Sequence, residues 1–398
     1  MIRLAVFMLF APSLLLFSTA SPTPLADPPA KADSKTADAF SGRTKDGRAR
    51  LLKEFGGSAE GEEAVMLGLA WLTQMQKQGG NWAYDTGMVN DHAAATGMAV
   101  LAFLGAGQSH KDGRYKQTVQ AGLDWLVKDV NMTQGRNYGK FMTVTNMYSQ
   151  GIATLALCEA YGMTRDPALK PVAQAAIDYI QKGQGPRGSW GYTAGTDNDT
   201  SILGWQIQAL HAAKLTQDLE VDDKVIEKAI KFLNFVSTGQ NKSAYGYNGP
   251  GGTPVSALSA IGLLCRYYVD GWRPETPGFA EGAKAFLRVP IASRTVGQLT
   301  NLYFYYYATQ VVRFYGGDEW KRWNEGPPGV DGKPTGGLSD WLLRLQVRTP
   351  TNRGSWDIEN GWFGANCGRL GTTCMCLLTM EVYYRYAPED NPKSVKTP

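Results

Sequence analysis

The stretch Gln181-Lys-Gly-Gln-Gly-Pro-Arg-Gly-Ser-Trp190 is followed by a strongly apolar segment, residues 200–214. The same order, a Gln- and Gly-rich turn carrying an aromatic residue and then an apolar segment, recurs about every 55 residues, around six times. The aromatic landmarks of the repeat are Trp82, Tyr138, Trp190, Tyr245 and Trp356, with one degenerate copy between the last two. A fixed period of this size predicts units that bury their apolar faces only by packing on their neighbours.

Two kinds of helix alternate along the repeats. The segments after the turns are apolar on almost every side, which predicts helices buried all round; they are residues 93–105, 147–161, 200–214, 254–269, 302–315 and 372–386. The segments before the turns, such as residues 62–77, 115–130, 168–182 and 222–236, place apolar residues at i, i+3, i+4 and i+7 with charges between them. This alternation predicts an all-α fold, a single α/α toroid (α6/α6 barrel) with an inner ring of apolar helices inside an outer ring. Neither terminal repeat has the polar face that would cap an open superhelix, which favours a closed ring.

The chain divides into one large domain and its flanks. Residues 58–390 are expected to form the toroid, and no linker separates two cores within them. Residues 1–20 combine a basic start, an apolar run and small residues at Ser18 and Ala20, which predicts a cleavable signal peptide; an uncleaved anchor is the alternative. Residues 21–57 are rich in Pro, Ala, Lys and Asp and are expected to be a disordered tether, and residues 391–398 a disordered tail.

These flanks predict an exported protein, secreted or periplasmic, with the cell envelope or a membrane surface as a candidate partner. The formal net charge is only +4 and the basic residues are dispersed among acids, so nucleic acid is not an expected partner. The sequence gives no indication of the oligomeric state.

The cysteines and histidines do not form a metal-ligand pattern. The five cysteines are an odd set that falls mostly within the apolar segments, which favours core packing over a disulfide scaffold, although one bridge through Cys367 stays open. On a helix, the thiols of Cys374 and Cys376 would point about 200° apart. The chain has only three histidines, His92, His110 and His211, and the last two fall near the far ends of the inner segments, so they do not assemble a convincing three-ligand zinc site. We therefore expect neither a metal nor another cofactor.

Three of the turns carry a resemblance to a known superfamily. Residues 181–190, Gln76-Lys-Gln-Gly-Gly-Asn-Trp82 and the stretch from Gln346 to Trp356 look like the Gln-Trp motifs of squalene and terpenoid cyclases. The whole repeat region resembles the prenyltransferase and squalene oxidase repeat proteins, which implies their α/α toroid. The motif itself has a structural explanation, because Gln can bond exposed helix-end groups while Trp packs beneath the turn. We assign the three tryptophans no catalytic role.

A second resemblance concerns acids. Asp197-Asn-Asp199-Thr-Ser201 resembles the Asp-X-Asp-Asp-Thr-Ala motif with which squalene-hopene-type cyclases protonate an alkene, which implies Asp197 and Asp199 as candidate catalytic acids. Alignment on Asp-Thr places Asn198 at the protonating position, and an amide cannot act as a strong acid. The alternative is that Asp199 or Thr200 only caps the helix that follows.

The relatives differ from this chain in two further respects. Squalene-type cyclases have two α/α domains, and only one is present here. Residues 371–377 are similar to the His-Thr-Cys-Tyr-Cys-Leu stretch of protein prenyltransferase β subunits, but Thr372 stands where their zinc-ligating His would be. The resemblance therefore implies no zinc site.

Ligand-binding residues are expected where the inner helices begin, because their N-termini converge at one mouth of a central cavity. Aromatic side chains there can bind a hydrophobic or cationic group or fill the core; the candidates for binding are His92, Tyr148, Trp205, Tyr303 and Tyr306. Three functions follow. The protein binds or isomerises an isoprenoid-type hydrophobic small molecule, serves as a non-catalytic envelope scaffold or binding module, or acts on polysaccharide. The last needs a second carboxylate, such as Asp91 or Glu359, within about 5 to 9.5 Å.

Overall fold

The computed structural model describes residues 40–197, 199–288, 291, 299–329, 332 and 334–386. The chain divides into two compact units, residues 1–33 and 34–398, and every described residue belongs to the second. The predicted signal peptide, residues 1–20, the predicted tail, residues 391–398, and Asn198 lie outside the described residues.

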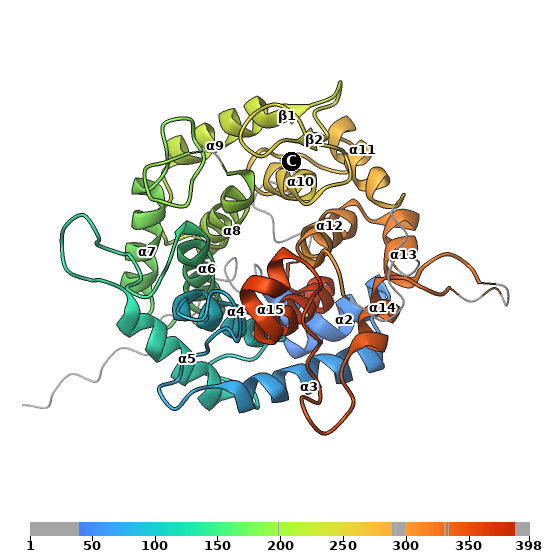
Figure 1. Cartoon of the computed structure of the whole chain (residues 1–398), viewed down its shortest axis with the longest axis horizontal. Coiled ribbons are helices and arrows are strands. Elements are labelled where there is room, and N and C mark those ends of the chain that lie inside the picture. The colour runs from blue at the N-terminus through green and yellow to red at the C-terminus, as the bar shows by residue number, and fades with distance from the viewer. Residues whose placement is uncertain are drawn as a thin grey trace, which may run out of the picture. The chain divides into compact units, whose positions relative to one another are not determined.

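Six long helices form a closed inner ring (Figure 1). They are α4 (His92–Gly105), α6 (Met147–Thr164), α8 (Thr200–Thr216), α10 (Ala257–Val269), α12 (Leu302–Tyr315) and α15 (Trp362–Met380). Each packs on the next, and α15 packs back on α4. Helix α4 illustrates why: every residue from Ala93 to Gly105 is buried, as expected for a segment that is apolar on all sides. The predicted α/α toroid is confirmed.

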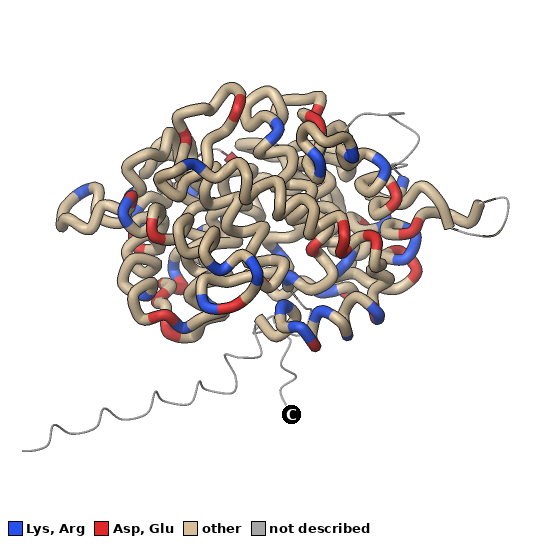
Figure 2. The backbone as a smooth tube through the Cα atoms, turned by 90° about the horizontal axis from the view of Figure 1, so that it is seen from below, with Lys and Arg blue, Asp and Glu red and all other residues tan. Residues whose placement is uncertain are grey.

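Amphipathic helices make the outer ring. They are α3 (Ala59–Met75), α5 (Lys116–Asp129), α7 (Lys170–Lys182), α9 (Asp223–Val236), α11 (Pro277–Phe286), α13 (Gly317–Glu325) and α14 (Leu338–Leu345). A small hairpin of β1 (Ser237–Thr238) and β2 (Ala244–Tyr245) lies beside α9 and α10. Figure 2 shows that most charged positions lie on the outer elements. Each outer helix thus turns an apolar stripe toward the inner ring and its charged side chains toward the solvent.

The Gln-Trp turns join each repeat to the next. Gln184 donates from Nε2 to the carbonyl oxygens of Gly188 (3.0 Å) and Val225 (2.8 Å), the latter in the next outer helix, α9. Trp190, fully buried, donates from Nε1 to the carbonyl of Ile180 at 2.8 Å. The Gln76/Trp82 and Gln346/Trp356 copies make the same bonds. These contacts explain the residues of the motif without any catalytic role.

The glycine two positions before each tryptophan is also required. Gly188 has φ +97°, and a Cβ there would lie 2.1 Å from the carbonyl oxygen of Lys228 on the next outer helix. Gly80 and Gly354 have the same conformation and the same close approach. In the second repeat the equivalent glycine is Gly139, and it precedes Phe141 by two residues. The choice of Tyr138 as the aromatic landmark of the second repeat was therefore wrong. Tyr138 is half-buried, and the buried ring of this repeat belongs to Phe141.

The last inner helix also differs from its prediction. It was expected over residues 372–386 but begins at Trp362 and bends at Gly368, which has φ +62°. It ends at Met380, before the short 3₁₀ helix η2 (Glu381–Tyr383). Glycines at 361, 364, 368 and 371 hide this helix in the sequence, because glycine is unfavourable in a helix interior. Cys367 consequently lies within a helix and not in a loop.

Part of the predicted tether, residues 21–57, is ordered. The chain forms η1 (Ser41–Arg43) and α2 (Lys45–Phe55), which begins at an N-cap bond from the backbone N–H of Gly47 to Thr44 Oγ1 (3.1 Å). Leu51 is fully buried on one face of α2, with Leu52 and Phe55 packed beside it. That apolar stripe is short, and charged residues surround it in sequence, which explains why the composition indicated disorder. The expectation for residues 21–39 falls outside the described residues.

Helix α2 lies across the C-terminal ends of the inner helices. Arg48 donates to the carbonyl of Ala106, just after α4, at 2.6 Å, and Trp320 of α13 donates to the carbonyl of Phe55 at 2.9 Å. We call this end of the toroid the floor and the opposite end, where the inner helices begin, the mouth. None of the helices in the described ranges is both long and apolar enough to cross a bilayer.

Candidate functional site

A cavity of about 390 Å³ opens at the mouth. It takes its walls from the starts of α4, α6, α12 and α15 and from the loops that lead into them, with Trp205 of α8 below. Most of its lining is aromatic or apolar; this group comprises Tyr84, Met88, Ala94, Met98, Tyr148, Ile152, Tyr192, Trp205, Tyr303, Trp362 and Phe363. Three of the five predicted ligand-binding residues, Tyr148, Trp205 and Tyr303, are therefore brought together at one cavity.

The other two predicted residues lie outside that lining. His92 is turned toward the outer ring, with its ring edge-on to Trp125 of α5 at 6.4 Å between centroids. Tyr306 is one turn further down α12 than Tyr303, where its ring stacks on Trp205 at 5.5 Å. The Tyr306 hydroxyl donates to Gln208 Oε1 at 2.8 Å, so it takes part in the core below the cavity.

Asp199 caps α8. Its Oδ1 accepts the backbone N–H groups of Ser201 (2.7 Å) and Ile202 (3.1 Å), so the cap is made by Asp199 and not by Thr200. Its Oδ2 accepts the Tyr247 hydroxyl at 2.6 Å and faces the Tyr148 hydroxyl at 3.5 Å. Burial raises the pKa of Tyr148, and Tyr303 and Asp199 raise it further, so this phenol stays protonated as a donor. Asp199 thus lies directly behind an aromatic residue of the cavity wall.

Asp197 faces a different neighbourhood. Its two carboxylate oxygens accept the backbone N–H groups of Arg187 (2.8 Å) and Ser189 (3.1 Å), which closes the Gln-Trp turn. It is 9% exposed and is not part of the cavity lining. The structure therefore does not bring the two candidate acids to one site.

A carboxylate that the sequence singled out only as a partner for polysaccharide chemistry lies directly behind the cavity wall instead. Asp91 is fully buried at the N-cap of α4, and it accepts hydroxyl bonds from Thr145 (2.7 Å) and Ser149, both of which line the cavity. Burial raises the pKa of Asp91, although the bonds from Ser149 and Thr145 lower it in part. Asp91 and Asp199 thus stand on either side of the start of α6.

Glu359 is turned away from the cavity. Its carboxylate accepts the backbone N–H of Gly364 at 2.9 Å and holds the first turn of α15. It is 4% exposed and does not line the cavity. Neither of the two carboxylates named for polysaccharide chemistry lines the mouth cavity, but Asp91 is bonded to two residues that do, Thr145 and Ser149.

Exposed apolar side chains surround the mouth. Trp362 is 60% exposed and Tyr192 is 52% exposed, and both also line the cavity. Tyr192 packs edge-on against Tyr148, with ring centroids 5.8 Å apart. Sequence reasoning missed both residues because it looked for binding rings on the inner helices, and these rings stand in a loop and at the first position of a helix. An aromatic residue next to a glycine-rich turn was the signal available for them.

The structure offers no metal centre within the ranges it describes. Those residues include no cluster of three or more His, Cys, Asp or Glu side chains that could hold an ion. All five cysteines are buried thiols without a disulfide, including Cys367, and burial raises the pKa of Cys367 to about 12. A group bound at the mouth would meet hydroxyls, amides and rings.

Comparison with solved structures finds the same fold in proteins of different activity. The chain is similar to an inactive variant of the α-1,6-mannanase GH76A of Salegentibacter sp. HEL1_6 in complex with α-1,6-mannotriose: TM-score 0.53, 12% identity, 81% of this chain and 99% of the other. It is similar to an α-amylase from Clostridium perfringens (TM-score 0.51, 13%, 81% and 98%). It is also similar to a variant of the type II terpene cyclase MstE from Scytonema with geranylgeranyl dihydroxybenzoate (TM-score 0.50, 12%, 82% and 97%).

No model of a known protein family matches the chain, and no curated protein matches it. At 12–13% identity the structural likeness establishes the α/α toroid alone.

Proposed function

We propose that the protein binds an uncharged, hydrophobic small molecule of isoprenoid type in the mouth cavity. The observation that carries this proposal is the lining: none of the described residues that form it is charged, and rings make up much of it. A volume of about 390 Å³ lies within the range of small-molecule sites. An apolar chain gains free energy by leaving water for such walls, whereas a charged ligand would lose hydration without a partner.

Two further features support an apolar ligand. The exposed rings of Trp362 and Tyr192 extend the apolar surface from the cavity to the outside, which provides a path of entry. A toroid of the same fold holds a geranylgeranyl compound in the MstE structure. We also propose that the protein works outside the cytoplasm, on the strength of residues 1–20.

If the ligand is also converted, we propose Asp91 and not Asp197 as the acid. Oδ2 of Asp91 is bonded to two hydroxyls of the cavity wall and its Oδ1 accepts the backbone N–H of Ala94, whereas both oxygens of Asp197 accept backbone N–H groups of a turn outside the lining. As an acid, Asp91 would pass its proton through the hydroxyl of Thr145 or Ser149, which line the cavity, to an alkene carbon, and it would recover a proton by the same route when the resulting carbocation loses one from a neighbouring carbon. The aromatic walls suit such a cation.

The test is native mass spectrometry of the purified protein with geranylgeraniol and with squalene. Wild type is expected to carry a bound isoprenoid. Ala94→Phe places a ring in the cavity and should abolish the bound species, while Ala49→Phe, the same change at the floor pocket, should leave it unchanged. Equal binding by the two variants would contradict the proposed site, and no binding by wild type would leave a non-catalytic scaffold as the better reading. Asp91→Asn separates retention of the ligand from its conversion.

A second candidate is action on polysaccharide, favoured by the exposed rings at the rim, since sugar faces stack on aromatic side chains. One of the similar mannanase structures is described as inactive with two neighbouring aspartates replaced. The adjacent aspartates of this chain are Asp222, which caps outer helix α9, and Asp223, which stands in the first turn of that helix; neither lines the mouth cavity. Mannotriose added in the same experiment decides between the ligands: a bound or cleaved sugar that Ala94→Phe abolishes would favour this candidate.

A further inference from the structure

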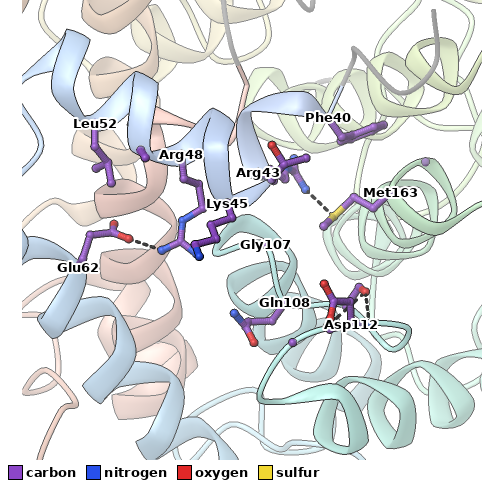
Figure 3. A pocket seen from close by; sticks show the side chains of 15 residues that line it. Phe40, Arg43, Lys45, Arg48, Leu52, Glu62, Gly107, Gln108, Asp112 and Met163 are labelled. Carbon is purple, nitrogen blue, oxygen red and sulfur yellow. Dashed lines mark hydrogen bonds and ion pairs between the residues drawn. The ribbon is translucent and has the colours of Figure 1, made fainter. Parts of the chain in front are cut away.

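A second pocket, of about 700 Å³, lies at the floor between α2 and the ends of α4 and α6 (Figure 3). Three cationic side chains from η1 and the start of α2 line it: Arg43, Lys45 and Arg48. Two acids, Glu62 and Asp112, lie on its opposite side. The mouth cavity has no charged residue in its described lining, so the two pockets differ in chemistry.

The buried charges next to this pocket do not balance. Glu159 is fully buried and binds two guanidinium groups, Arg43 Nη1 at 2.7 Å and Arg385 Nη2 at 3.0 Å. The side chains of both arginines are at most 4% exposed. Two positive charges therefore share one negative charge, and removing an uncompensated charge from water is costly.

A second buried carboxyl in this region, Glu381, makes no ion pair with the arginines among the described residues. Glu381 is fully buried, and neither of its oxygens has a hydrogen-bond partner among the described residues. Burial raises its pKa well above 4.5, although Arg385, Arg43 and Arg48 pull it down. Burial disfavours the ionised form of such a carboxyl, and Glu381 makes no hydrogen bond to either arginine among the described residues.

Donors remain on the arginines as well. Within the described ranges, Arg43 Nη2 and Arg48 Nε are buried and have no hydrogen-bond partner. Arg43 is 3% exposed and its guanidinium end lies at the pocket, next to Met163 (Figure 3). The Lys45 ammonium is exposed and forms no ion pair with a described residue. Glu62 is already bound to Arg48 and to the Tyr384 hydroxyl at 3.0 Å.

We propose that the floor pocket is a binding site for a small oxyanion of the phosphate class, held by Arg43, Arg48 and Lys45. Guanidinium and ammonium donors bind phosphate oxygens through charge-assisted hydrogen bonds. The anion balances the buried positive excess and accepts the unpartnered N–H of Arg43. This site is at the opposite end from the mouth cavity and does not depend on what that cavity holds.

The test uses thermal unfolding and isothermal titration calorimetry of the full chain with inorganic phosphate, at constant ionic strength set with chloride. Phosphate is expected to raise Tm and to bind at a single site. Lys45→Met should weaken phosphate binding about tenfold, whereas Lys53→Met, on the same helix but outside the pocket, should leave it unchanged. Both lysines are exposed, so neither change threatens the fold.

The substitution Asp112→Asn should change the affinity for phosphate in the opposite direction. It removes a negative charge from the pocket and should tighten phosphate binding severalfold. Equal weakening by Lys45→Met and Lys53→Met would show nonspecific adsorption to α2 and overturn the site. Absence of any phosphate effect beyond that of chloride, or a loss of binding in Asp112→Asn, would overturn it as well. Loss of the mouth ligand with phosphate binding intact would refute only the proposed function.

Discussion

The mouth and the floor are built from opposite ends of the same inner helices and have opposite chemistry. At the mouth, the donors to the buried carboxyl groups of Asp91 and Asp199 from the described residues are neutral hydroxyl and backbone groups. At the floor, the buried carboxylate of Glu159 is held by two arginines. The apolar cavity lies beside the first pair, and the cation-lined pocket lies beside the second.

Helix polarity contributes to the difference, while the cations that line the floor pocket come from η1 and α2. The N-terminal ends of α4, α6, α8 and α10 are capped by Asp91, Asn146, Asp199 and Ser256. Basic residues occupy the last turns of α8, α10 and α12: Lys214, Arg266 and Arg313. An N-terminus favours oxygen acceptors and negative charge, and a C-terminus favours positive charge. A ring whose inner helices begin at the same end therefore gathers acceptors at one face and cations at the other.

The largest loss of stability should come from a substitution at the floor. Glu159→Gln leaves Arg43 and Arg385 without a buried counter-charge and is expected to lower the free energy of unfolding by about 3–5 kcal/mol. Glu54→Gln, which breaks the exposed pair with Arg50, should cost less than about 0.5 kcal/mol. Urea denaturation followed by circular dichroism measures both. Equal costs would show that the floor does not depend on its buried charges.

A smaller loss is expected at the mouth. Asp199→Ala removes the cap of α8 together with the bond from Tyr247, and should cost about 2 kcal/mol. Asp222→Ala removes an exposed cap of the outer helix α9 and should cost about 0.5–1 kcal/mol. Chemical denaturation of the two variants compares them. If Asp222→Ala cost more, burial would not be what strengthens the mouth cap.

A gain in stability is expected from a substitution at a second floor residue, Glu381. Glu381→Met replaces an unpartnered buried carboxyl by an apolar chain of similar length and should raise stability by about 1 kcal/mol at pH 8. Because the folded pKa of Glu381 is raised above 4.5, its contribution is fully present below about pH 4.5 and declines as pH rises. The gain should therefore be larger at pH 8 than at pH 4.

Glu159 has the opposite dependence on pH. Burial alone would raise its pKa, but Arg385 and Arg43 outweigh burial and lower it below 4.5. Its contribution is present above pH 4.5 and is lost as pH falls through the folded pKa. The pH dependence expected for Glu381 is checked by thermal unfolding of wild type and Glu381→Met between pH 4 and pH 8. A difference in stability that does not change with pH would contradict the raised pKa of Glu381.

The smallest change in stability is expected at the rim. Trp362→Ser removes a ring that is 60% exposed and should alter the free energy of unfolding by less than about 0.5 kcal/mol. It should nevertheless weaken isoprenoid binding, because Trp362 lines the entrance of the cavity. Phe235→Ser, at a ring that is 45% exposed on outer helix α9, is the control and should leave binding unchanged. Identical ligand binding by the two variants would remove the rim from the site.

The fold was predictable because its signals are local and repeated. Inner helix α12 runs over the predicted residues 302–315, since its apolar residues continue without interruption. Helix α15 was misplaced because glycines break the apolar pattern before Gly371. Helix α2 was missed because its stability comes from contacts with distant groups such as Ala106 and Trp320, which composition does not reveal.

The site was predictable only in part. Tyr148, Trp205 and Tyr303 could be named because they lie near the starts of inner helices. His92 and Tyr306 satisfy the same criterion, and only the rotation and depth of their helices exclude them from the lining. The resemblance of residues 197–201 to an acidic motif drew attention to Asp197, whose oxygens close a turn. Asp91 gained its importance from Thr145 and Ser149, which are far away in the sequence.

The bond from Gln346 to the carbonyl of Ala64 joins residues that are 282 positions apart and closes the seam between the last repeat and the first. During synthesis, α3 and α4 emerge long before α14 and α15, which cover them. The first repeat must therefore wait, with one apolar side uncovered, until nearly the whole chain has been made. Closure of the ring is therefore a late event in folding, and the first repeat is where a holding chaperone has the most apolar surface to protect.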